Sequence, residues 1–74
     1  MLRMTQARRG RGWSRAVLGR RARVHPSDVG KIEAGRLLPY PAQARRLARV
    51  LGLTAETLLE EVRPHDAPDG DHPA

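Results

Sequence analysis

The chain contains no cysteine and no phenylalanine, and it has one Trp and one Tyr. Without cysteine it can form neither a disulfide nor a thiolate metal site. The scarcity of aromatic side chains argues against single-strand nucleic-acid binding, which uses aromatic rings as stacking platforms. No apolar run approaches the about 20 residues of a membrane span, and the N-terminus lacks the apolar core of a signal peptide. We therefore expect a cytoplasmic protein with no membrane partner.

Positive charge is abundant in contrast. Fourteen Lys and Arg against eight Asp and Glu give a formal net charge of +6. Residues 1–63 hold all fourteen basic side chains and five of the acidic ones, whereas residues 64–74 hold the other three acids. A compact basic body favours a polyanionic partner such as nucleic acid. A general enrichment in arginine would give the same charge, so charge alone leaves the partner open.

The length of 74 residues allows one domain. From residue 64 onward Pro, Gly, Asp and His dominate and apolar residues almost vanish. We therefore expect a folded domain over residues 1–63 and a disordered acidic tail, rich in Pro, Gly and His, over residues 64–74. A domain this small buries only roughly 60% of its unfolded surface, so its stability is expected to be modest.

Three short helices are predicted in the first half of the chain. The first covers the basic segment 3–11. The second opens at Ser14, which is a good N-cap. The third restarts at Pro26, because proline is favoured at the first helical position, and ends at Gly35, which suits a left-handed cap. Two prolines within residues 37–41 then exclude a helix there.

Two further helices are predicted after that loop. The fourth covers residues 41–51 and has the strongest periodicity, with one apolar side and one arginine-rich side expected to face solvent. The apolar side consists of Ala44, Leu47, Ala48 and Leu51, and the arginines are Arg45, Arg46 and Arg49. Thr54 caps a short fifth helix, whose apolar residues either close the domain's own core or form a dimer surface. These residues are Leu58, Leu59 and Val62. The fold class is therefore all-α, with five helices.

The spacing of apolar and special residues across these helices matches a known pattern. The matching residues are Ser14, Leu18, Val24, Val29, Ile32, Glu33, Gly35, Arg36 and Pro39, followed by Leu47, Ala48, Leu51, Gly52 and Leu53. In this the chain resembles the phage Cro and repressor type of helix-turn-helix protein, also called the XRE-like family. The resemblance implies a compact lambda-repressor-like DNA-binding domain with the helix-turn-helix at the second and third helices. It also implies that the third helix, residues 26–34, enters the major groove.

Outward residues of the third helix are the predicted base contacts. Val29 and Ile32 supply its buried side, because they lie three residues apart. The remaining candidates are Pro26, Ser27, Gly30 and Lys31. Ser27 can donate or accept at a base edge, and Lys31 can reach guanine or a phosphate. Gly30 is small enough to let the helix approach the groove closely, and both polar residues could equally be ordinary solvated side chains.

Residues around that helix are the predicted phosphate contacts, namely Arg15, His25, Arg36 and Arg23. Arg15 follows the cap of the second helix, where the family often places a Gln that contacts a phosphate. Arg23 replaces the customary Gly of the turn, so we expect it to need a left-handed backbone. Gly19 replaces an Ala that usually lets the two helices cross closely. Arg8 and Glu33 resemble a pair that ties the first helix to the end of the third, which implies a structural role for both.

Together these features predict a sequence-specific, double-stranded DNA-binding transcriptional regulator, expected to be a repressor that acts as a homodimer on DNA. One alternative is a protein-interaction module on the same fold, which Pro26, Asp28 and Gly30 favour. The other is the antitoxin of a toxin–antitoxin pair, which the weakly apolar tail disfavours. The three histidines and the absence of cysteine provide no convergent pocket of titratable groups. We therefore expect no enzymatic activity, no metal, no cofactor and no small-molecule ligand.

Overall fold

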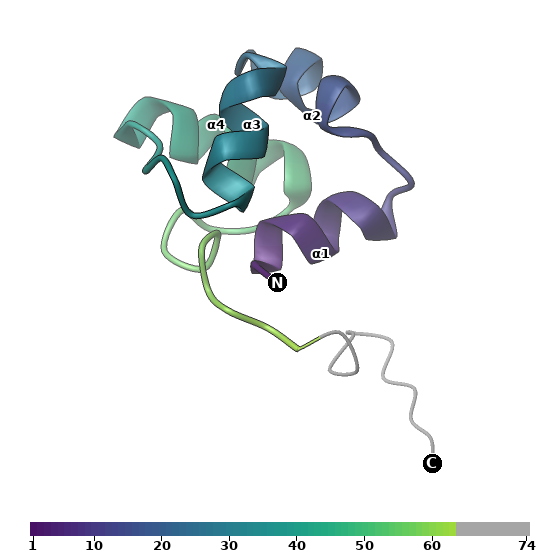
Figure 1. The fold of residues 1–74 in the computed structure, drawn as a ribbon, viewed down its shortest axis with the longest axis vertical. Coiled ribbons are helices and arrows are strands. Elements are labelled where there is room, and N and C mark those ends of the chain that lie inside the picture. The colour runs from purple at the N-terminus through teal and green to yellow at the C-terminus, as the bar shows by residue number, and fades with distance from the viewer. Residues whose placement is uncertain (64–74) are drawn as a thin grey trace.

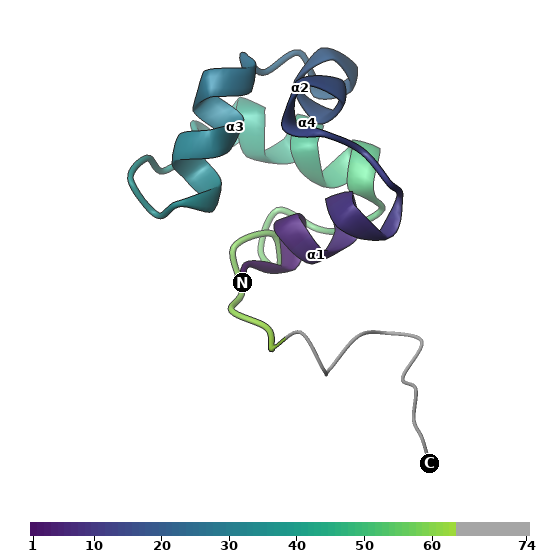
Figure 2. The same ribbon diagram turned by 45° about the vertical axis from the view of Figure 1, so that its right-hand side comes forward.

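The computed structural model describes residues 1–63, which form four helices and no strand. Helix α1 spans Arg3–Gly10, α2 spans Arg15–Ala22, α3 spans Pro26–Glu33 and α4 spans Pro41–Leu51. Figures 1 and 2 show α4 crossing behind α2 and α3, while α1 lies below them and meets the segment that follows α4. The tail predicted to be disordered lies outside the described residues.

One core joins all four helices. Its members are apolar residues on the inward sides of the helices, together with one residue of the turn between α2 and α3 and one residue after α4. They are Met4, Leu18, Ala22, Val24, Val29, Ile32, Leu47, Ala48, Leu51 and Leu58. Burial of such side chains is the main stabilising contribution in a domain without disulfides. None of the helices in residues 1–63 is long and apolar enough to cross a membrane.

Local chemistry sets the helix boundaries as predicted. The Ser14 Oγ accepts a hydrogen bond from the Val17 amide at 3.1 Å and caps α2. Gly35 and Gly52 follow α3 and α4 with φ of 77° and 70°, a region that glycine enters without steric cost. Helix α3 starts at a proline, whose missing N–H would have had no partner in the first turn.

The fifth helix predicted after Thr54 is not formed. Residues 55–59 form turns instead, in which Thr57 N donates to Thr54 O at 3.2 Å and Glu60 N donates to Thr57 O at 3.1 Å. These bonds join residues three apart, whereas an α-helix joins residues four apart. The hydroxyls of the two threonines also lie 3.1 Å from each other, and the Thr57 Oγ1 donates to Thr54 O.

The start of α1 explains this difference. The N-cap residue of α1 is Leu2, whose side chain offers no cap to the free amides of the first turn. Carbonyls of the segment after α4 take that role instead. The Arg3 amide donates to Glu60 O at 2.7 Å and the Met4 amide to Leu58 O at 3.0 Å. The segment is therefore shaped by bonds to α1 rather than by its own helical propensity.

The apolar residues of this segment belong to the domain's own core. Leu58 is fully buried, Val62 is 8% exposed, and Leu59 packs partly buried against the core. Of the two roles that the sequence left open for these residues, the structure shows that Leu58 and Val62 close the domain's own core. A dimer surface that used Leu58 or Val62 would therefore require the domain to open.

Both ends of the described chain meet beside α1. The Val62 amide donates to Met1 O at 2.7 Å, and the Met1 ammonium donates to a Glu61 carboxylate oxygen at 2.7 Å. An isolated antiparallel bridge also pairs Leu2 with Glu61. These contacts hold residues 60–62 against the first residues of the chain (Figure 2).

Candidate nucleic-acid interface

The turn between α2 and α3 depends on two backbone features. Gly19 is buried beneath the turn, and a β-carbon there would strike the carbonyl oxygen of Val24. Arg23 has φ 58° and ψ 44°, which confirms the left-handed backbone predicted for it. It is the sole residue other than glycine in residues 1–63 with a positive φ. The two features bring the start of α3 close against α2.

Arg46 of α4 completes this corner. Its Nε donates to Ala22 O at 2.9 Å and its Nη2 donates to Arg23 O at 3.1 Å. The last carbonyls of a helix lack partners within the helix, so this guanidinium caps α2 from outside. Arg46 is half-buried, which corrects the solvent-facing position expected from the periodicity of α4. The sequence holds no signal for this contact, because it depends on how α2 and α4 cross.

The outward face of α3 carries the predicted base contacts. Val29 and Ile32 are buried, as predicted, and Pro26, Ser27 and Lys31 are exposed. This leaves a short polar face on a helix of eight residues, narrow enough to enter a major groove.

Gly30 has a neighbour that the sequence did not reveal. It is half-buried, and a β-carbon built on it would lie 3.7 Å from the Cδ of Arg15. The side chain of Arg15, from the first turn of α2, therefore passes over α3 at Gly30. A β-carbon at this distance would make an ordinary contact with the Arg15 side chain, so the path of Arg15 does not require a glycine.

Arg15 is held there by Glu33, the last residue of α3. Its Nε donates to Glu33 Oε1 at 3.0 Å. The same carboxylate receives two bonds from Arg8 of α1, from Nε at 2.7 Å and from Nη2 at 3.1 Å. The side chains of Arg8 and Glu33 are 8% and 3% exposed, whereas that of Arg15 is 56% exposed. A single carboxylate thus joins α1, α2 and α3 and holds one exposed guanidinium beside α3.

The surroundings of Glu33 also determine its ionisation. Burial alone would raise the pKa of Glu33, but the hydrogen bonds and positive charges of Arg8 and Arg15 outweigh it. The net result is a pKa below the ordinary value of a glutamate. The carboxylate is therefore ionised at neutral pH, and it neutralises the buried Arg8.

His25 is the N-cap of α3. Its Nδ1 accepts from the Ser27 amide at 3.1 Å and lies 2.9 Å from the Ser27 Oγ. A neutral imidazole with an unprotonated Nδ1 can accept both bonds. The predicted base contact Ser27 is thus oriented by the predicted phosphate contact His25, and both side chains are exposed.

The two remaining predicted phosphate contacts lie far apart. Arg36 is exposed just beyond α3, where its amide donates to Lys31 O at 2.8 Å. Arg23 is exposed at the opposite end of α2 from Arg15, and an eight-residue helix is about 12 Å long. Arg15 and Arg36 therefore both lie near the end of α3, whereas Arg23 precedes its start and lies beside Arg46 and Arg49 of α4.

Trp13 stabilises the link between α1 and α2. Its carbonyl oxygen accepts from Arg8 Nη1 at 2.8 Å. The Cζ atoms of Arg21 and Arg11 lie 4.6 Å and 5.5 Å from the centre of its ring, within the range of cation–π attraction. Trp13 thereby reports on the surroundings of Arg21, because it is the one tryptophan of the chain.

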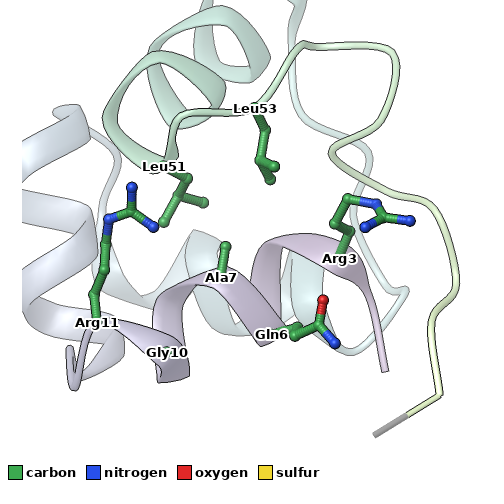
Figure 3. Close-up of a pocket in the computed structure, with 7 residues that line it drawn as sticks. All are labelled: Arg3, Gln6, Ala7, Gly10, Arg11, Leu51 and Leu53. Atoms are coloured by element: carbon green, nitrogen blue, oxygen red, sulfur yellow. The ribbon is translucent and has the colours of Figure 1, made fainter. Parts of the chain in front are cut away.

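An apolar hollow of about 330 Å³ lies away from this interface (Figure 3). Its lining comes from α1, the end of α4 and the following loop, and no residue of α2 or α3 contributes. Arg3 and Arg11 stand at its two ends, and Ala7, Leu51 and Leu53 form its apolar wall. Arg3 is already paired with Glu60, and the hollow does not communicate with the outward face of α3.

Two short helices joined by a left-handed turn, with an exposed polar face on the second, define a helix-turn-helix protein. A family model described as a helix-turn-helix domain matches residues 2–62. The chain therefore belongs to the helix-turn-helix domain family, which indicates a DNA-binding regulator. No curated protein and no solved structure matches the chain.

Proposed function

We propose that this protein is a transcriptional repressor that recognises specific sites in double-stranded DNA through α3. The observation that carries the proposal is the position of Arg15, which Glu33 holds beside the outward face of α3. Glu33 occupies the Nε of Arg15, so both terminal nitrogens of the guanidinium remain able to donate. Two parallel donors of this kind match the geometry of a phosphate group.

Base reading falls to the exposed residues of α3. Lys31 reaches guanine O6 or N7 in the major groove, and Ser27 donates to or accepts from a base edge. Pro26 contributes apolar contact at the start of the helix. Gly30 allows close approach of α3 to the groove and lies beneath the Arg15 side chain, so its contribution to base recognition is indirect.

Contacts to the DNA backbone fix the register of α3 without reading sequence. Arg15 and His25 supply them on the side of α2, and Arg36 supplies them beyond the end of α3. Arg23 lies at the end of α2 opposite Arg15, two residues before His25.

The proposed active form is a homodimer on DNA. A single domain of this size buries roughly 600–1,000 Å² on DNA, which gives one half-site little affinity. Two copies on half-sites one helical turn apart would supply the rest. The contact between copies uses residues other than Leu58 and Val62, because both are buried within one chain.

Selection from random double-stranded DNA tests the proposal. The winning sequence is then measured with the wild type and with Lys31→Ala, Arg15→Ala and, as a control, Arg45→Ala. Arg45 is exposed on α4, so its loss removes one charge away from α3. We expect Lys31→Ala to relax the base preference and Arg15→Ala to weaken all sequences alike by at least threefold more than the control.

The same experiment separates this function from its main rival. If no motif emerges and binding vanishes at physiological salt, the fold serves a protein partner instead. A single copy bound per operator in sedimentation analysis would overturn the homodimer.

A further inference from the structure

A second hollow of about 330 Å³ lies between the end of α2 and the second half of α4. Four arginines and two apolar residues line it, namely Arg21, Arg23, Arg46, Arg49, Ala22 and Val50. No carboxylate contributes to this lining. Four guanidinium groups around one hollow repel one another, and an anion of high charge density would relieve that repulsion.

One of these arginines is held in a fixed position. Arg46 donates from Nε to Ala22 O and from Nη2 to Arg23 O, at 2.9 Å and 3.1 Å. These bonds orient the plane of its guanidinium and leave its Nη1 without a bond to the described residues. A rigid donor of this kind loses little conformational freedom when it binds an anion.

Arg23 provides an independent observation. Its backbone lies in the left-handed region, with φ of 58°. Glycine enters this region freely, whereas a residue with a long side chain is strained there. Backbone strain of this kind concentrates at functional sites. Arg23 lines an arginine-rich hollow and has a left-handed backbone that glycine would adopt without strain. We therefore infer that the positive charge of its side chain has a function there.

We propose that this hollow binds a compact polyphosphate anion, such as pyrophosphate or the linked phosphates of a nucleotide. Arginine suits this ligand because its planar fork donates two parallel hydrogen bonds to phosphate oxygens. Ala22 and Val50 are the apolar members of the lining, and Val50 is the one that is partly exposed. The site lies at the end of α2, about 12 Å along that helix from Arg15.

The test titrates inorganic pyrophosphate into the full chain at constant ionic strength, followed by calorimetry and by the fluorescence of Trp13. The fluorescence should respond because Arg21, one of the residues that line the hollow, places its guanidinium 4.6 Å from the centre of the Trp13 ring. Orthophosphate, ATP and a short DNA duplex are titrated in parallel. We expect saturable one-to-one binding of pyrophosphate, at least tenfold tighter than that of orthophosphate.

Variants locate the site. Arg23→Gly removes a cation and suits the left-handed backbone, so it leaves the fold intact; Arg49→Ala removes a second cation. Both should weaken pyrophosphate binding at least tenfold, whereas Arg45→Ala on the same helix and Lys31→Ala on α3 should leave it within twofold of the wild type. Pyrophosphate binding that Lys31→Ala abolishes and Arg23→Gly spares would place the anion on the DNA-reading face and overturn the proposal.

Two other outcomes also overturn it. A linear response to every anion that does not saturate would show that the hollow attracts anions only by nonspecific electrostatic interaction. Suppose that the wild type does not bind pyrophosphate and that Arg23→Gly binds the DNA duplex more weakly than the wild type does. The hollow would then bind phosphates of the DNA backbone and not a free anion.

Discussion

The Val24 amide donates to the carbonyl oxygen of Gly19 at 2.9 Å, and the Val24 carbonyl oxygen turns back toward the Gly19 Cα. A β-carbon on Gly19 would lie closer to that oxygen than nonbonded carbon and oxygen atoms approach. We therefore expect Gly19→Ala to push α3 away from α2. The free energy of unfolding should fall by about 1–3 kcal/mol, even though alanine favours helices, and urea denaturation followed by Trp13 fluorescence measures it.

Gly30 is the matched control, because it is also a helical glycine facing another helix. A β-carbon there would lie 3.7 Å from the Arg15 Cδ, which is an ordinary contact. Gly30→Ala should raise the free energy of unfolding by about 0.5–1 kcal/mol through the higher helix propensity of alanine. Equal stabilisation by both substitutions would show that the crossing of α2 and α3 has room for a side chain.

Glu33→Gln should destabilise the protein strongly at pH 7. Removal of the carboxylate charge leaves the buried Arg8 guanidinium without compensation, and such a loss typically costs about 3–5 kcal/mol. Glu60→Gln breaks the ion pair with Arg3, whose two side chains are 35% and 50% exposed. That control should cost less than about 1 kcal/mol. Denaturant titration of both variants beside the wild type tests the contrast.

The pH dependence of this difference follows from the lowered pKa of Glu33. A carboxylate with a depressed pKa in the folded state stabilises the protein above the pKa of the unfolded chain, and it loses this contribution as pH falls through the folded pKa. The stability gap between the wild type and Glu33→Gln should stay constant at neutral pH and close as pH falls below about 4.3. A gap that narrows between about pH 7 and pH 5.5 would contradict an ionised, arginine-bound Glu33.

Arg23→Gly should stabilise the protein. Its left-handed backbone strains an arginine but not a glycine, so the free energy of unfolding should rise by about 1 kcal/mol. Arg36→Gly removes the same side chain from an exposed position that lacks a positive φ. It should give no gain, because glycine there only adds freedom to the unfolded chain. Thermal unfolding of the two variants would contradict this account if both shifted the midpoint equally.

Binding to DNA should weaken steeply with salt. We assume that each bound domain contacts about five phosphates. A plot of the logarithm of the association constant against the logarithm of the salt concentration should then have a slope near −4 to −5 for each bound domain. Arg15→Ala should make this slope shallower by about 1, since it removes one phosphate contact. Fluorescence anisotropy of a labelled duplex at several salt concentrations gives the slope, and an unchanged slope for Arg15→Ala would exclude a phosphate contact by that residue.

Much of the fold was predictable from the sequence, because local chemistry determines it. Ser14, Pro26 and Gly35 act on their own neighbours, so the boundaries of α2 and α3 follow from residue types alone. The periodicity of α4 likewise predicted which side is buried. The left-handed turn at Arg23 was predicted from the family resemblance, in which a glycine is customary at this position.

Contacts between distant segments were not predictable. The residues after α4 have a helical pattern, yet Leu58 O and Glu60 O accept hydrogen bonds from amides of α1 that lie 54 and 57 residues away in sequence. Arg46 looked like a solvent-facing residue of α4, and only the crossing of α2 and α4 brings it to the free carbonyls of α2. The same holds for Arg15, whose path over Gly30 depends on how α2 packs against α3.

The contacts of residues 60–62 with the start of the chain bring the two ends of the described domain side by side. Proteins whose ends lie together usually tolerate circular permutation at an exposed loop. A short linker from Arg63 to Met1, with new ends in the exposed loop around Leu38, would preserve the core and all four helices. The new ends of such a permuted chain would lie beside α3, where a second DNA-binding domain could be fused.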